Sequence, residues 1–452
     1  MEMTQTTHWV VGERSGSLFP SGCPPQVWQP GRPEWTFDRE RDEFAAKYWK
    51  LWNESGVDSP APLDPVTARE RRGCEREADE LIAWLQDWVK QYPEAQSARA
   101  AWREPLLDRL RSFSESVLGF SERCGAVLFS GPYRRATADF MRQARAFDPT
   151  LKAEDLFQAM RNVWIANSIQ LLLDRPVTLT PPVFAYSMLY PYTDNLLDDP
   201  EVPAAVKQEM SCWLTGRLRG SPALPQTSRE RDIGQLLDII DRTYPVPDFP
   251  ELHWSLQAIH QAQTDSLRQH SPVPFSDAAE LGPLSVAKGG ASVLADGFLV
   301  AGKLTRPQAD FLFGYGVVLQ FLDDLQDVGR DLEARHHTVF TSGAAQGPLD
   351  GLTNRLHGFI ARVFQSADGL AEEGRGALQE LITTSCGLMI PHAVASHPQF
   401  YTREYSACLE TGSRFSFRFI RERRGTIERA SQKAWHALER RHELDSVLCV
   451  LD

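Results

Sequence analysis

The sequence is poor in cysteine and lacks the patterns that would turn its cysteines into a site. Seven cysteines are spread over 452 residues, and no two have the C-x-x-C spacing of a zinc ribbon or a redox centre. Residues 1–16 lack the apolar stretch of a secretory leader, so we expect reduced thiols and a cytoplasmic location. No run approaches the ~18 apolar residues of a membrane-spanning helix, which predicts a soluble protein without a transmembrane segment.

The sequence also lacks an excess of positive charge. Acidic residues outnumber basic ones by 60 to 48, which gives a formal net charge of −12. Such a chain has no broad basic face to meet a phosphate backbone, and this excludes a general nucleic-acid binder. Hydrophobic residues make up 42% and charged residues 24%, the proportions of a folded globular protein rather than a disordered one.

Alternation of the strand kind is almost absent, and helical spacing dominates. Leu81, Trp84, Leu85 and Trp88, for example, share one face of a helix. Residues 1 to about 65 are rich in proline and tryptophan and are expected to pack through aromatic anchors rather than as regular elements. The sequence therefore predicts an all-α protein, with helices at about 104–119, 153–174, 181–199, 203–219, 228–243, 250–269, 277–302, 306–335, 352–367, 373–392 and 403–445.

Two acidic segments stand out within the predicted helices. In the first, Asp194 and Asp198 are four residues apart and share one helical face, while Asp199 points further round, at the helix end before Pro200. The second carries four carboxylates that fall within about 100° of one helical wheel: Asp323, Asp324, Asp327 and Asp331.

A solvated acidic face would explain either segment alone. Both, however, follow strongly apolar and aromatic helix, at 183–192 and 311–322, which is expected to be buried. An acidic face that continues a buried helix is expected to line a cavity, where carboxylates must be paired, protonated or metal-bound. Hard oxygen ligands without nearby histidine or cysteine favour Mg²⁺, which binds through a few carboxylates and the phosphates of a substrate.

These motifs resemble those of the class I isoprenoid (terpenoid) synthases. Asp323-Asp324-x-x-Asp327 is similar to the second aspartate-rich motif of the trans-prenyl diphosphate synthases. The segment from Asp327 to Asp331 is similar to the D-V-G-x-D arrangement of phytoene and squalene synthases. Asp194 to Asp198 resembles the first motif, in the form found in bacterial terpene synthases. The resemblance covers about residues 130–340. It implies a helical bundle around a central cavity over 106–452, preceded by an N-terminal Trp/Pro-rich and helical extension over 1–105.

A basic element lies 35 residues before Asp323. Lys288-Gly289-Gly290 is expected to interrupt a helix, because two glycines loosen the backbone. Prenyl synthases have a diphosphate-binding lysine on a broken helix at a similar place, and the resemblance gives Lys288 this role. The alternative is a kink with a surface lysine.

The arginines give weaker evidence for a diphosphate site. Arg134 and Arg135 lie where prenyl synthases have a basic element, here without its lysine, and Arg330 follows the second motif. The resemblance makes all three candidate diphosphate ligands, although Arg330 could instead neutralise Asp331. For the later Arg414, Arg418 and Arg421, as for most of these arginines, a solvated basic face is the preferred interpretation.

A prenyl chain and its carbocation need dry, aromatic walls. Tyr190 precedes Asp194 by four residues, where prenyl synthases limit chain length, and Phe321 is a second candidate for substrate contact. For each candidate taken alone, plain core is the preferred interpretation. The full set of candidate wall residues is Tyr186, Tyr190, Phe298, Phe313 and Phe321.

The resemblance implies a Mg²⁺-dependent terpene synthase that ionises an allylic prenyl diphosphate, with several ions bridged by the diphosphate. The metal ligands would be Asp194, Asp198, Asp323, Asp324 and Asp327, with Asp199 and Asp331 as further ligands. Alternatives are a chain-elongating prenyl diphosphate synthase, a head-to-head condensing enzyme, or a non-catalytic helical binding protein. The absence of an arginine pair after Asp199 favours the cyclase over elongation. The oligomeric state stays open, a homodimer included.

Overall fold

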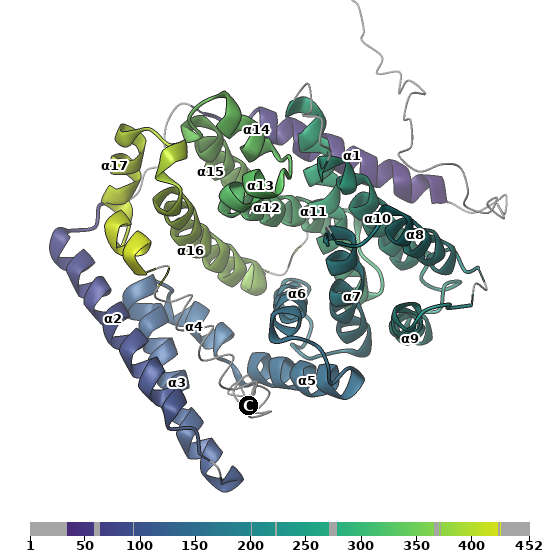
Figure 1. Cartoon of the computed structure of the whole chain (residues 1–452), viewed down its shortest axis with the longest axis horizontal. Coiled ribbons are helices and arrows are strands. Elements are labelled where there is room, and N and C mark those ends of the chain that lie inside the picture. Colours follow the sequence, from purple (N-terminus) through teal and green to yellow (C-terminus); the bar gives the residue numbers. More distant parts are fainter. Residues whose placement is uncertain are drawn as a thin grey trace, which may run out of the picture.

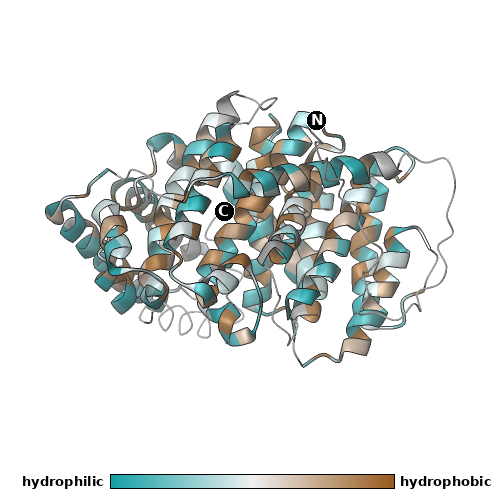
Figure 2. Cartoon of the chain, turned by 90° about the horizontal axis from the view of Figure 1, so that it is seen from above, coloured by the Kyte–Doolittle hydropathy of each residue, from teal (hydrophilic) through white to brown (hydrophobic). Residues whose placement is uncertain are grey.

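The computed structural model describes residues 34–57, 64–93, 95–199, 201–221, 224–270, 278–365, 370, 372–423 and 425. Every regular element within these ranges is helical, which confirms the all-α prediction (Figure 1). Hydrophobic residues gather on the faces that the helices turn toward one another (Figure 2).

The α-helices of the described residues are α1 (Glu34–Asn53), α2 (Ala68–Lys90), α3 (Arg99–Phe113), α4 (Glu122–Leu128), α5 (Gly131–Phe147), α6 (Ala153–Leu172), α7 (Pro181–Asp198), α8 (Ala204–Leu218), α9 (Ser228–Thr243), α10 (Pro250–Ser266), α11 (Ala278–Ala301), α12 (Arg306–Gln326), α13 (Val328–Ala334), α14 (Val339–Gln346), α15 (Asp350–Gln365), α16 (Glu372–Ser396) and α17 (Arg403–Gly412). Most helices from α6 onward begin and end close to where the sequence predicts them, whereas α1, α4 and α5 lie outside the predicted segments.

Helix α11 is the centre of the bundle. It packs between α10 and α12, and also contacts α1, α6 and α7. Its stretch Glu280–Ala301 is long and apolar enough to cross a membrane by length and composition, and 67% of an 18-residue window within it is buried inside the protein. Its apolar character is therefore accounted for by the helices packed around it.

Helix α1 corrects the expectation that residues 1–65 lack regular structure. Its apolar residues recur on one face and enter the main core, where Tyr48 and Trp52 are fully buried. The Trp52 ring lies 4.3 Å from that of Phe321, and Tyr48 donates a hydrogen bond to the carbonyl oxygen of Asp310 at 2.9 Å. The prolines lie outside residues 34–53, so none breaks this helix.

Helices α2 and α3 form a hairpin arm at one side of the bundle (Figure 1). The indoles of Trp88 and Trp102 stack 3.7 Å apart, and each donates its Nε1 hydrogen to the other residue's carbonyl oxygen. Trp84 and Leu85 pack against this pair, which confirms the helical face predicted there. The division of the chain at residue 105 stays a prediction.

Three predicted helices are interrupted. The segment 104–119 changes to a π-helix at Ser114–Leu118 and ends at Gly119, whose φ is +83°. The segment 306–335 breaks at Asp327, and the segment 403–445 ends its first helix at Gly412. Residues 426–452 lie outside the described part of the chain.

The break predicted at Lys288-Gly289-Gly290 is wrong, because α11 runs through it without interruption. The glycines instead allow α11 and α12 to approach closely. A Cβ atom on Gly289 would lie 2.6 Å from the carbonyl oxygen of Gly316, and one on Gly316 would lie 2.0 Å from that of Gly289. Close helix packing, not backbone strain, therefore accounts for these glycines.

Four of the described cysteines are free thiols, as expected: Cys74, Cys124, Cys386 and Cys408. Cys212 is disulfide-bonded, which corrects the expectation that every thiol is reduced.

Candidate functional site

Hydrogen bonds between α7 and α11 fix how the two helices are aligned. The hydroxyls of Tyr190 on α7 and Ser292 on α11 lie 2.8 Å apart. Asn162 on α6 bridges the same two helices, because its Nδ2 donates hydrogen bonds at 3.0 Å to Ser187 on α7 and to Asp296 on α11. The two helices therefore run antiparallel. One helical turn beyond Tyr190 is Asp194, and one turn before Ser292 is Lys288, so these two residues lie at the same level of the bundle.

Contacts between α11 and α12 bring the second acidic segment to that level. Ser285 donates a hydrogen bond to Asp324 Oδ2 at 3.0 Å, and Gly289 packs on Gly316 and Gln320. Since these helices are also antiparallel, Asp323 lies within about a turn of Lys288 along the bundle. The two acidic segments therefore lie at the same end of the bundle.

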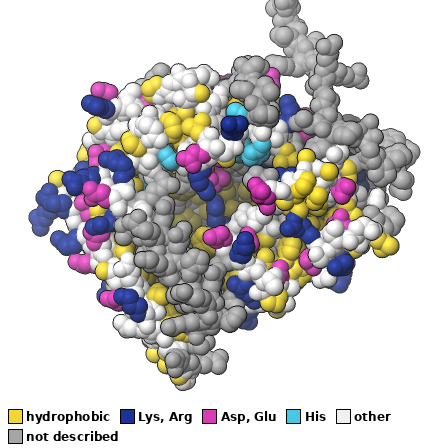
Figure 3. Space-filling model, in the orientation of Figure 1, with side chains coloured by type: hydrophobic (Ala, Val, Ile, Leu, Met, Phe, Trp, Pro, Cys, Tyr) yellow, Lys and Arg dark blue, Asp and Glu magenta, His cyan; other side chains and the backbone are white. Residues whose placement is uncertain are grey.

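The surface is hollowed near this end of the bundle (Figure 3). Hydrophobic side chains form the floor of the hollow, and acidic, basic and histidine side chains lie around its rim. An apolar hollow with charged groups at its mouth suits a ligand with a hydrocarbon body and a charged head.

Asp323 is partly open to solvent. Its side chain is 52% exposed, and its Oδ1 is 3.7 Å from Nη2 of Arg161 on α6. The pKa of Asp323 is raised, chiefly because protein surrounds the carboxylate; repulsion from Asp327 adds to the shift, and attraction by Arg161 and Lys288 opposes it. The site thus holds negative charge that cations only partly neutralise.

Arg161 was not predicted as a site residue. It is an exposed cation flanked by the buried residues Met160 and Asn162 on α6. A lone arginine in an apolar helix was the signal that could have identified it, because a charge at such a position needs a partner or an opening to solvent.

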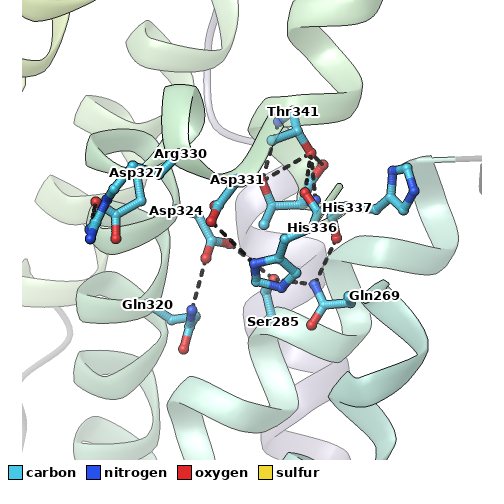
Figure 4. A network of polar contacts seen from close by, with 11 residues as sticks. Gln269, Ser285, Gln320, Asp324, Asp327, Arg330, Asp331, His336, His337 and Thr341 are labelled. Atoms are coloured by element: carbon cyan, nitrogen blue, oxygen red, sulfur yellow. Dashed lines mark hydrogen bonds and ion pairs between the residues drawn. The ribbon is translucent and has the colours of Figure 1, made fainter. Parts of the chain in front are cut away.

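Asp324 does not share the face of Asp323, which corrects the prediction of four carboxylates on one face. It is only 3% exposed, and it accepts hydrogen bonds from Ser285 and from Gln320 Nε2, the latter at 2.8 Å (Figure 4). Burial raises the pKa of Asp324 to about 7. Its side chain is directed into the contact with α11, so Asp324 serves packing between helices rather than the hollow.

The remaining stripe is Asp323, Asp327 and Asp331, spaced four residues apart across the break between α12 and α13. Asp327 forms an ion pair with Arg330, and Asp331 Oδ1 lies 3.2 Å from Nδ1 of His336 (Figure 4). Arg330 therefore neutralises Asp327 in this structure, a partner that the sequence did not suggest.

The described carboxylates of the first acidic segment have separate partners. Asp194 is half-buried and accepts a hydrogen bond from Gln263 on α10. Asp199 is exposed and accepts a hydrogen bond from the backbone of Glu201 at 2.9 Å, so it closes its own turn. The side chain of Asp198 lies outside the described part of the structure.

The arginine pair at the start of α5 is not brought to the acidic end. The hydroxyl of Tyr133, the neighbour of Arg134 and Arg135, lies 3.1 Å from that of Ser168. Ser168 is about 10 Å along α6 from Arg161, on the side away from the acidic end. The structure therefore gives Arg161, rather than this pair, the position beside a carboxylate.

Three predicted wall residues are core residues. Phe321 and Phe313 pack on Trp52 and Tyr48 of α1, with ring centroids 4.3 and 6.1 Å apart, and Phe298 packs on Phe37. Tyr186 and Tyr190 instead line a small cavity between α7, α8, α9 and α10.

The donor chemistry of the stripe fits Mg²⁺, since it consists of carboxylate oxygens whose mutual repulsion the neighbouring cations only partly relieve. Within the described residues, however, no three carboxylate, imidazole or thiolate groups are gathered at one metal position. Such a stripe could hold Mg²⁺ only together with further ligands, of which the phosphate oxygens of a substrate are the usual kind.

Comparisons with known proteins identify no family. No protein-family model matches the chain, and no curated protein matches it.

Proposed function

We propose that this protein is a Mg²⁺-dependent class I terpene synthase with the helical bundle of that superfamily, acting in the cytoplasm. The observation that carries the proposal is the common level of Asp194, Lys288 and Asp323 at one end of an all-helical bundle. The resemblance of the two acidic motifs supports it, and so does the apolar floor of the adjoining hollow.

The cations at this end suit a diphosphate. Arg161 Nη2 lies 3.7 Å from Asp323 Oδ1, and the positive charges of Arg161 and Lys288 both oppose the rise in the pKa of Asp323. Both cations would therefore attract a phosphate group bound beside this carboxylate. Asp194, Asp323, Asp327 and Asp331 would hold Mg²⁺ jointly with the substrate. Bound Mg²⁺ would stabilise the negative charge that develops on the departing diphosphate.

The apolar floor would exclude water from the hydrocarbon chain. Ionisation breaks the allylic C–O bond, whose electron pair leaves with the diphosphate. Water at the resulting carbocation would quench it prematurely, so dry walls are needed for cyclisation.

The test is to incubate the protein with Mg²⁺ and geranyl, farnesyl or geranylgeranyl diphosphate, with and without isopentenyl diphosphate, and to analyse a hexane extract. A hydrocarbon or alcohol formed without isopentenyl diphosphate is the expected result. Longer diphosphates formed only with isopentenyl diphosphate would identify an elongating enzyme. No turnover under any condition would overturn the proposal and favour a binding protein.

A further inference from the structure

One short piece of the chain contacts both acidic segments. It consists of the last turn of α10 and the 3₁₀-helix Leu267–His270 that follows. Gln263, half-buried on that last turn, donates a hydrogen bond from Nε2 to Oδ1 of Asp194 on α7. A glutamine amide is a neutral donor. It therefore fixes the direction of the Asp194 carboxylate without cancelling its negative charge, whereas Arg330 neutralises Asp327.

Gln269, six residues further along, attaches the loop between α13 and α14. The side chain of Gln269 is buried. Its carbonyl oxygen accepts a hydrogen bond from the backbone N–H of His337 at 2.8 Å, and its Nε2 donates to the carbonyl oxygen of His337 at 3.0 Å (Figure 4). The same Nε2 lies 3.5 Å from Oγ of Ser285, the donor to Asp324. Gln269 thus holds this loop against α10 and α11.

His270 extends the contact to Asp331. Its ring stacks on that of His336, with centroids 4.4 Å apart and planes within 11° of parallel. Nδ1 of His336 lies 3.2 Å from Oδ1 of Asp331, and the backbone N–H of His336 donates to the carbonyl oxygen of Asp331 at 2.7 Å. The stacked ring restricts the rotation of His336, and through His336 it restricts the Asp331 carboxylate.

We infer that residues 263–270 are a shared support for both groups of metal ligands, in which Gln263 positions Asp194 and His270 positions Asp331. This inference rests on the proposed function. A support that contacts both segments sets their separation before a ligand arrives, so less ordering is needed on binding. Loss of a partner that orients a metal ligand typically lowers metal affinity or activity about 10–100-fold.

The first test is calorimetric titration of Mg²⁺ into the protein at a fixed concentration of inorganic diphosphate. Gln263→Met keeps the length of the side chain and removes the donor, and it should weaken Mg²⁺ binding about tenfold or more. In an Asp194→Ala background the same change should have almost no further effect, because the carboxylate that Gln263 positions is gone. A merely structural role would weaken binding equally in both backgrounds.

Gln261→Met is the matched control. Gln261 is exposed on the same helix and donates from Nε2 to Asp265, also on α10, at 3.0 Å. Its affinity for Mg²⁺ should equal that of wild type, and circular dichroism checks that each variant folds. Gln263→Asn keeps the amide but is one carbon shorter, so it loses the bond to Asp194 and gives the same test should Gln263→Met not fold.

The second test concerns His270, whose side chain is exposed. His270→Ala removes the stacked ring and should weaken Mg²⁺ binding by about threefold to tenfold, the range for loss of one aromatic pair. His270→Phe keeps a ring over His336 and should retain wild-type affinity. Equal affinities of these two variants would overturn the role of His270.

The remaining outcomes separate this inference from the proposed function. Wild-type affinity in folded Gln263→Met would overturn the role of Gln263 and leave the terpene synthase proposal intact. Mg²⁺ binding as expected, without product from any prenyl diphosphate, would overturn the terpene synthase and leave the support as part of a metal–diphosphate site. No binding of Mg²⁺ by wild type in the presence of diphosphate would overturn both.

Discussion

Arg161 on α6 and Asp323 on α12 approach to 3.7 Å across the bundle. Their side chains are 61% and 52% exposed, and ion pairs so exposed contribute only about 0–1 kcal/mol to stability. The fold therefore gains little from holding these charges together. In the proposed function, Arg161 would supply the positive charge that a diphosphate bound beside Asp323 requires.

The first prediction concerns Arg161. Arg161→Gln should lower kcat/KM for the prenyl diphosphate by at least about tenfold, since a hydrogen bond to a charged group contributes about 1.5–3 kcal/mol. The melting temperature should hardly change. Arg142→Gln is the control, because Arg142 is an exposed arginine that pairs with Asp139 on its own helix α5. Equal activity of the two variants would remove Arg161 from the site.

The second prediction separates two adjacent carboxylates. Asp323→Asn should lower kcat/KM about a thousandfold, because it removes charge that the metal and diphosphate require. Asp324→Asn should lower it at most about tenfold, because Asp324 is directed into the contact with α11 and the asparagine oxygen can still accept from Ser285 or Gln320.

Thermal unfolding, which needs no turnover, checks the same two carboxylates. Mg²⁺ with inorganic diphosphate should raise the melting temperature of wild type and of Asp324→Asn, because ligands that bind only the native state stabilise it. Asp323→Asn should show a much smaller rise. A larger loss in Asp324→Asn than in Asp323→Asn would contradict the orientation of both side chains.

Sequence patterns sufficed for most of the fold, because helical periodicity is local. The segment 228–243, for example, was predicted with its observed ends, where Thr227 closes a capping box with Glu230. The misses depend on tertiary contacts. The glycines of α11 suggested a break, yet the reason for them is the partner helix α12, whose backbone would come within 2.6 Å of a Cβ at Gly289. Tryptophans near proline-rich sequence suggested irregular packing, yet Trp52 lies on a helical face that α12 and α15 bury.

The candidate site was harder to predict than the fold. A helical wheel treats Asp323 and Asp324 as neighbours on one face, but 100° of rotation is enough to direct Asp324 into the contact with α11. The alignment of α7, α11 and α12 depends on bonds such as Tyr190 to Ser292, which no single helix encodes. Arg161 was missed because its partner lies on a helix far along the chain.

The third prediction concerns pH and Asp296, which is 1% exposed and has an Oδ2 atom with no hydrogen-bond partner among the described residues. Burial raises the pKa of Asp296 well above its usual range. The folded protein therefore keeps a proton that the unfolded chain loses near pH 4. Stability should fall as the pH rises above about 4, toward the raised pKa.

Urea unfolding at pH 5 and pH 8 checks this dependence. Asp296→Asn cannot ionise, and its side-chain oxygen can still accept from Asn162. Its stability should therefore decline less between the two pH values than that of wild type. Asp139→Asn, a change at the protein surface, should decline as wild type does. Parallel curves for wild type and Asp296→Asn would show that this carboxyl does not control the effect.

The fourth prediction tests the close contact of α11 and α12. In Gly316→Ala the new Cβ would lie 2.0 Å from the carbonyl oxygen of Gly289, and a backbone atom cannot move aside as a flexible side chain can. The free energy of unfolding should fall by about 3 kcal/mol or more, the upper range for overpacking. Gly234→Ala on α9 is the matched control, because nothing lies within 4 Å of its Cβ position. It should raise the free energy of unfolding by roughly 0.5–1 kcal/mol, since alanine loses less backbone entropy on folding. Urea unfolding should thus show that the same substitution lowers the free energy of unfolding at Gly316 and raises it at Gly234. A stable Gly316→Ala variant would mean that α11 and α12 lie further apart than described.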